Sequence, residues 1–132
     1  MERLARKFDT ARKMVPAPVT VVNGTSKIGL IAYGTTDFAV TESREQLKAE
    51  YTLETDYLRI RAYPFTREIH EFVAAHDRIY VIEQNRDAQM LSLLKLDLPP
   101  EDAVKLRSVR HYNGLPIDAS SVTDELVMQE GI

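Results

Sequence analysis

The sequence predicts a three-layer α/β/α domain, in which helices cover both faces of a mostly parallel sheet. Short β-rich runs alternate with helical patterns of about 10 to 12 residues, which is typical of such sheets. The chain has 132 residues, of which 44% are hydrophobic and 28% charged, so it can form one soluble domain with one core. No apolar run approaches the roughly 18 residues that a membrane span requires.

The start of the chain, "MERLARKFDTARKM", is charged and predicts a linker helix. Its narrow apolar stripe consists of Leu4, Phe8, Ala11 and Val15. The prolines of "PAPV" then stop the helix, and a helix followed by such a break is typical of a domain boundary. We therefore expect residues 1–17 to be a linker helix with a Pro-rich boundary and residues 18–132 to be the domain itself.

The next three segments are expected to be two strands and a helix. "VTVV" (19–22) and "KIGLIAY" (27–33) are β-rich, and the turn signal "NGTS" between them favours a hairpin-like reversal. "DFAVTESREQLKAEY" (37–51) spaces apolar residues among charges at helical intervals, and Asp37 is placed to cap this helix.

The rest of the chain repeats the alternation. "DYLRIRAY" (56–63) reads as a strand whose arginines alternate outward, and "TREIHEFVAAH" (66–76) as a helix capped by Thr66. The remaining predicted elements are the strand "RIYVIEQ" (78–84), the helix "DAQMLSLLKLDL" (87–98), the short helix "PPEDAVKL" (99–106), the strand "RSVRHY" (107–112) and the helix "SSVTDELVMQ" (120–129).

Composition excludes several classes of function. A formal net charge of −3 and an isoelectric point near 5.6 argue against nucleic-acid binding. The chain has no cysteine and hence no disulfide, thiolate metal site or directly ligated iron–sulfur cluster, which suits a cytoplasmic protein. His70 and His76 are six residues apart and cannot share a helix face as metal ligands, and His111 is isolated, so no metal site is expected.

Two polar loops follow predicted strands, "YGTTD" and "IEQNRD". Right-handed crossovers place both at the same edge of the sheet, and a reversal of winding direction would make them flank a crevice. Gly34 permits a tight turn, while Thr35 and Thr36 offer hydroxyls and amides near a helix start, where an anionic group is favoured. The alternative is a tight turn followed by an ordinary helix cap.

The second loop carries the denser cluster, with Glu83, Gln84, Asn85 and Arg86. Glu83 at a strand end suits a base or an electrostatic partner, and Asn85 suits a loop held through its backbone. The alternative is that Asn85 and Asp87 only cap the following helix. Because the cluster lies just past the apolar residues of the strand, shortening Glu83, Asn85 or Arg86 is expected to cost under about 1.5 kcal/mol in stability, unless Asn85 is a cap, but to weaken assembly.

The ordered set "ARKMVPAPV", "KIGLIAYGTTDFAV", "YLRIRAYPF", "VIEQNRDAQM" and "LRSVRHYNGLPI" resembles the carboxyl-terminal domain of the alpha subunit of 2-oxoacid:ferredoxin oxidoreductases, the 2-oxoglutarate type above all. Related sequences usually have glycine where this chain has Ala88. The resemblance implies a transketolase carboxyl-terminal-like fold with five strands, the first antiparallel. It also implies no catalytic residue in this chain and an interface or crevice at Gly34, Thr35, Thr36, Arg61, Glu83, Asn85, Arg86 and Gln89.

The resemblance implies that the chain is part of an enzyme that oxidatively decarboxylates a 2-oxoacid to an acyl-CoA and passes electrons to ferredoxin. The holoenzyme would use thiamine diphosphate, magnesium, an iron–sulfur cluster and CoA, none of them bound by this chain alone. Its partners would be an upstream alpha-subunit domain, the beta subunit and, indirectly, ferredoxin. The chain would then serve assembly and wall the active site. A rival hypothesis from the "GTT" turn is a free-standing module that binds a small molecule or nucleotide.

Overall fold

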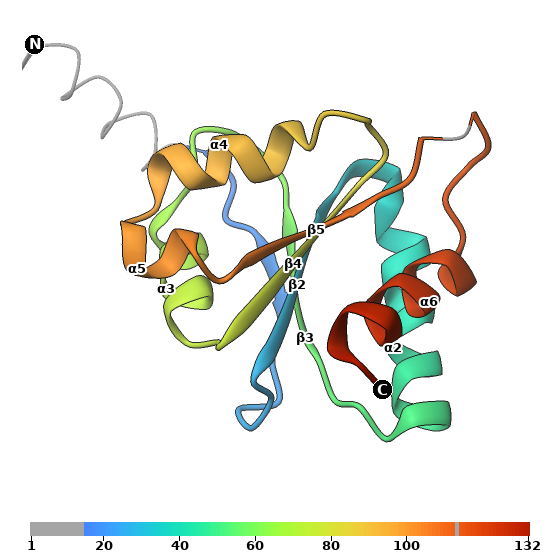
Figure 1. The fold of residues 1–132 in the computed structure, drawn as a ribbon. Coiled ribbons are helices and arrows are strands. Elements are labelled where there is room, and N and C mark those ends of the chain that lie inside the picture. Colours follow the sequence, from blue (N-terminus) through green and yellow to red (C-terminus); the bar gives the residue numbers. More distant parts are fainter. Residues whose placement is uncertain (1–14, 113) are drawn as a thin grey trace, which may run out of the picture.

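A five-stranded sheet forms the centre of the fold, with the strand order β1-β3-β2-β4-β5 (Figure 1). The structure is a computed structural model and describes residues 15–112 and 114–132. The strands are β1 (Val19–Val21), β2 (Ile28–Tyr33), β3 (Asp56–Ile60), β4 (Arg78–Glu83) and β5 (Leu106–Arg110). β1 runs antiparallel to β3, and the other neighbours are parallel. The predicted mixed sheet with an antiparallel first strand is confirmed.

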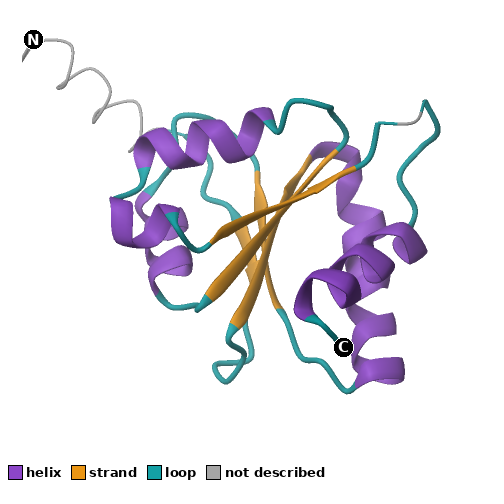
Figure 2. Ribbon diagram, in the orientation of Figure 1, coloured by secondary structure: helices purple, strands orange, loops and turns teal. Residues whose placement is uncertain are grey.

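Helices cover both faces of the sheet and so confirm the three layers (Figure 2). One face carries α2 (Asp37–Tyr51) and α6 (Ala119–Glu130). The other carries α3 (Arg67–Ala74), α4 (Gln89–Asp97) and α5 (Pro100–Ala103). A short 3-10 helix, η1 (Gly34–Thr36), leads from β2 into α2. The predicted linker helix lies outside the described residues.

The strands supply alternating side chains to two separate cores. In β2, Leu30 points into the core under α2 and α6, whereas Ile31 points into the core under α3 and α4. Gly29 lies where α3 approaches the sheet most closely. A Cβ atom at this position would lie 2.7 Å from both Ile79 Cδ1 and Phe72 Cε1, so glycine permits the close contact between α3 and β2.

The predicted hairpin between the first two strands is wrong, because β1 pairs with β3 and not with β2. The loop does turn as expected, since Asn23 Oδ1 accepts hydrogen bonds from the backbone N–H groups of Thr25 and Ser26, each at 3.0 Å. The Asn23 N–H donates to Asp56 Oδ1 at 2.9 Å, which ties the loop to the first residue of β3. β3 therefore takes the place beside β2, and β1 forms the sheet edge beyond it.

Two predicted helix caps differ in detail. Thr36, not Asp37, occupies the N-cap position of α2, and Asp37 is the first residue of the helix. Thr66 does occupy the N-cap position of α3, but its hydroxyl makes no capping hydrogen bond. Among the described residues, no helix has both the length and the apolar character needed to cross a membrane.

Candidate functional site

A crevice lies where the chain leaves β2 and β4 for opposite faces of the sheet. β2 lies between β3 and β4, and the helices that follow β2 and β4, α2 and α4, cover opposite faces. The cavity between the two connections has a volume of about 380 Å³. Its lining residues are Tyr33, Gly34, Thr35, Thr36, Gln84, Asn85 and Gln89. The structure thus brings the two polar loops together, as the crossover argument predicted.

Gln84 joins the two walls of this crevice. Its amide nitrogen donates to Thr35 Oγ1 at 3.3 Å and to Thr36 Oγ1 at 3.1 Å. The Asn85 amide nitrogen donates to the Tyr33 hydroxyl at 3.3 Å. Burial raises the pKa of Tyr33, and the nearby Glu83 carboxylate raises it further, so this hydroxyl keeps its proton at neutral pH.

A second cavity of about 290 Å³ adjoins the first at Gly34 and is lined also by Arg59, Ile60 and Arg61. The register of β2 against β3 explains this arrangement. Ala32 of β2 pairs with Arg59 of β3, so two residues further along Arg61 lies opposite Gly34, with its side chain on the same face as that of Arg59. Arg61 was among the predicted crevice residues. Arg59 was not, and only the alternation of "LRIRAY" placed it on the same face of the strand as Arg61.

Asp37, the first residue of α2, is a partner of Arg59, which lines the second cavity. Its carboxylate accepts a hydrogen bond of 2.8 Å from the Tyr57 hydroxyl and lies 3.9 Å from Arg59 Nη1. Burial raises the pKa of Tyr57 well above its ordinary value, and the Asp37 carboxylate adds to the increase. Tyr57 therefore acts as a hydrogen-bond donor, and Asp37 remains as a partial counter-charge to Arg59.

Glu83 does not lie past the strand as expected, and this removes the reason for the predicted tolerance to shortening. It is the last residue of β4, and its side chain is 0% exposed. Its carboxylate accepts hydrogen bonds from Met90 N at 2.6 Å, Leu91 N at 3.1 Å and Asn85 Nδ2 at 2.9 Å. Glu83 thus binds the first turn of α4 from below and positions the loop on which the crevice depends.

The loop from Asn85 to Gln89 begins α4. Asn85 Oδ1 accepts a hydrogen bond of 3.2 Å from Gln89 N, which fits the capping alternative for Asn85. Asp87 instead lies 3.5 Å from the Arg86 guanidinium. Ala88, at the N-cap position, has φ of 51° and ψ of 51°, a left-handed conformation that favours glycine. Glycine would adopt this backbone conformation without the steric cost that a Cβ atom brings.

We expect Ala88→Gly to stabilise the domain by about 1 kcal/mol, because it removes the left-handed strain of a residue with a Cβ atom. Urea unfolding monitored by circular dichroism measures the change. Ala49→Gly, at an exposed position within α2, is the matched control and should destabilise by about 0.5 to 1 kcal/mol. A loss of stability in both variants would show that the left-handed site carries no strain.

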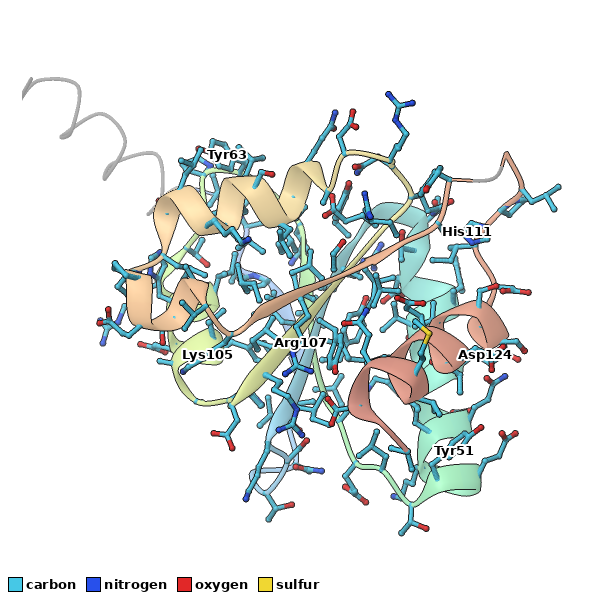
Figure 3. All side chains as sticks on the ribbon, in the orientation of Figure 1. Tyr51, Tyr63, Lys105, Arg107, His111 and Asp124 are labelled. Atoms are coloured by element: carbon cyan, nitrogen blue, oxygen red, sulfur yellow. The ribbon has the colours of Figure 1, made fainter. Side chains whose placement is uncertain are left out.

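Large side chains surround the crevice on the loops that follow the strands. Figure 3 labels Tyr63, after β3, and His111, after β5. We call the exposed residues on these connections the carboxyl-edge surface; they are Phe38, Tyr63, Arg86, Tyr112 and Leu115. Phe38 is 81% exposed, although its place in the predicted helix gave no sign of this. Arg86 belongs to this surface rather than to the crevice wall, and its carbonyl accepts a 2.5 Å hydrogen bond from Arg110 Nη1.

Comparisons with known proteins find a likeness among solved structures. No family model matches the chain, and no curated protein matches it. Among solved structures, the chain is similar to 2-oxoglutarate:ferredoxin oxidoreductase from Magnetococcus marinus, whose structure holds 2-oxoglutarate, coenzyme A and succinyl-CoA, with a TM-score of 0.79 and 18% identity. The match covers 97% of this chain and 23% of that chain. This likeness shows the fold, and the chain spans about a quarter of the protein it matches.

Proposed function

We propose that the chain is a domain, or a separately encoded subunit, of a thiamine diphosphate-dependent 2-oxoacid:ferredoxin oxidoreductase of the 2-oxoglutarate type, located in the cytoplasm. In this proposal it serves assembly and walls the active site, and the chemistry takes place elsewhere. The supporting observation is that nearly the whole chain superposes on one part of such an enzyme. The ordered sequence motifs from Ala11 to Ile117 support the same family independently of the fold.

The residues of this chain do not suit the metal ion or the iron–sulfur cluster of that reaction. Within residues 15–112 and 114–132, no three His, Cys, Asp or Glu side chains are grouped so as to hold a metal ion. The sequence offers no cysteine for an iron–sulfur cluster. We therefore assign thiamine diphosphate, its magnesium ion and the cluster to the partners, which are an upstream alpha-subunit domain and the beta subunit, and derive no chemical step here.

The carboxyl-edge surface is the proposed docking surface for these partners. Exposed aromatic and arginine side chains are the types that contribute most to protein interfaces. Phe38 and Arg86 project from different connections and make few contacts within the domain, since Arg86 pairs only with the neighbouring Asp87 among the described carboxylates. Because they add little to the domain's own packing, their removal should affect association much more than folding.

The test is the double variant Phe38→Ser with Arg86→Glu in the chain expressed with a tag in its native source. We expect the wild-type chain to co-purify with 2-oxoacid- and CoA-dependent viologen reduction, and the variant to lose that activity by well over tenfold. The melting temperature of the isolated variant should shift by only a few degrees. Lys48→Glu, in the last turn of α2 and so at the opposite end of that helix from Phe38, is the control and should keep the activity. Undiminished co-purification of the double variant would contradict the proposed docking surface.

A further inference from the structure

We propose that the crevice binds a small hydroxylated molecule that carries a phosphate or carboxylate group, with the anion held between Arg59, Arg61 and the loop Gly34–Thr36. The two cavities that meet at Gly34 have volumes of about 380 and 290 Å³. Each is in or near the range of small-molecule sites. This inference concerns the isolated chain and does not depend on its partners.

The cavity next to β3 carries positive charge that the described residues neutralise only in part. Arg61 Nη1 donates to the carbonyl of Ala17 at 3.4 Å, which is a neutral acceptor. In the part of the chain that the structure describes, no carboxylate forms an ion pair with Arg61, and Arg59 has only Asp37 at 3.9 Å. Two guanidinium groups thus face a common cavity with one partial counter-charge in a protein whose formal net charge is −3. Arginine binds phosphate and carboxylate oxygens through paired N–H donors.

The hydroxyls of Thr35 and Thr36 add further donors on the other side of Gly34. Both hydroxyl oxygens accept from the Gln84 amide, so each hydroxyl proton remains to be donated to another acceptor. The hydroxyl donors of the β2–α2 connection and the guanidinium donors of Arg59 and Arg61 therefore line two cavities that share Gly34. An acceptor-only group such as an oxyanion complements this set of donors.

The larger cavity defines the rest of the ligand. Besides the threonines, its polar lining consists of the amides of Gln84, Asn85 and Gln89 and the hydroxyl of Tyr33. These groups are uncharged, and each both donates and accepts hydrogen bonds. They suit the hydroxyl groups of a small polar body better than a second charge or an apolar group. A sugar phosphate is therefore the simplest probe of this class.

The experiment is a nuclear magnetic resonance titration of the full 132-residue chain with ribose 5-phosphate, inorganic phosphate and ribose as separate probes. We expect ribose 5-phosphate to shift the amide signals of Gly34, Thr35, Arg59 and Arg61, and to bind roughly tenfold more tightly than inorganic phosphate. Ribose alone should cause no saturable shift. If ribose 5-phosphate leaves these signals unchanged at millimolar concentration, the proposed site does not exist.

Variants distinguish binding of the anion at this site from non-specific attraction of the anion to positive charge on the chain. Arg59→Gln and Arg61→Gln together should weaken ribose 5-phosphate binding by at least roughly tenfold, with the dispersed amide spectrum of the folded domain retained. A control pair, Arg67→Gln with Lys48→Gln, removes the same number of charges outside the crevice lining and should leave the affinity within about twofold. An equal loss in the two pairs would mean that binding reflects net charge, and the site would be disproved.

Discussion

Replacing Glu83 with alanine should lower the free energy of unfolding by about 3 kcal/mol or more, in contrast to the small effect that its position in the sequence suggests. The Glu83 carboxylate accepts hydrogen bonds from two backbone N–H groups of α4 and from the Asn85 amide, in a site without solvent exposure. Alanine would leave the two backbone donors without this acceptor and the Asn85 amide with the Tyr33 hydroxyl alone. Each unsatisfied donor costs about 1 to 3 kcal/mol, less whatever an entering water recovers. Urea unfolding gives the difference directly.

Glu83→Gln should lie between the wild type and the alanine variant. Its carbonyl oxygen can still accept from Met90 N and Asn85, but its amide nitrogen would face Leu91 N, so one of the backbone bonds is lost. Glu42→Ala, at an exposed position on α2, is the control and should change stability by no more than about 0.5 kcal/mol. Similar stability of the Glu83→Ala and Glu42→Ala variants would contradict the buried network.

Replacing His76 with alanine should destabilise the domain by about 3 to 5 kcal/mol. His76 is 3% exposed, with Nε2 at 2.7 Å from Asp56 Oδ2 and Nδ1 at 2.6 Å from the Phe72 carbonyl oxygen. Its ring also contacts the Phe72 ring, with centroids 4.4 Å apart. Alanine would leave Asp56, which is 1% exposed, with the backbone N–H of Asn23 as its remaining partner. Thermal or urea unfolding measures the loss.

The partly exposed pair of His70 and Asp97, 2.8 Å apart, offers a matched control. His70→Ala should cost about 1 kcal/mol or less, because solvent compensates for the lost partner. In the background of Asp56→Asn, the cost of His76→Ala should fall by more than about 1 kcal/mol, since the carboxylate is no longer present to be left unpaired. Strict additivity of the two changes would show that His76 and Asp56 are not energetically coupled.

Much of the fold follows from local sequence patterns. The helix predicted over residues 37–51 coincides with α2, because its apolar spacing and its flanking turn agree. The pairing of β1 could not be predicted in the same way. The loop from Asn23 to Ser26 closes through its own side chains, yet which strand lies beside β1 depends on where β3 inserts. The turn residues therefore predict that the chain reverses direction, and they do not predict which strand pairs with β1.

The position of the crevice between the two loops could be predicted from the sequence, whereas several of the side chains that reach it could not. Right-handed crossovers place the two loops together for any sequence with this order of elements. Arg59 reaches the site only through the register of β3 against β2, which no local pattern specifies. Glu83 was expected just past the strand, and its burial depends on α4 starting directly above it. The left-handed backbone of Ala88 could not be predicted, because alanine rarely adopts this conformation.

The central claim is that this chain belongs to a larger 2-oxoacid:ferredoxin oxidoreductase and contributes no chemistry of its own. The most direct measurement is viologen reduction with 2-oxoglutarate or pyruvate and CoA, made in parallel on the purified chain alone and on the complex isolated from its native source through the tagged chain. We predict reduction by the complex, and none by the chain alone above a protein-free control. Turnover by the chain alone, or a complex without 2-oxoacid-dependent activity, would contradict the account.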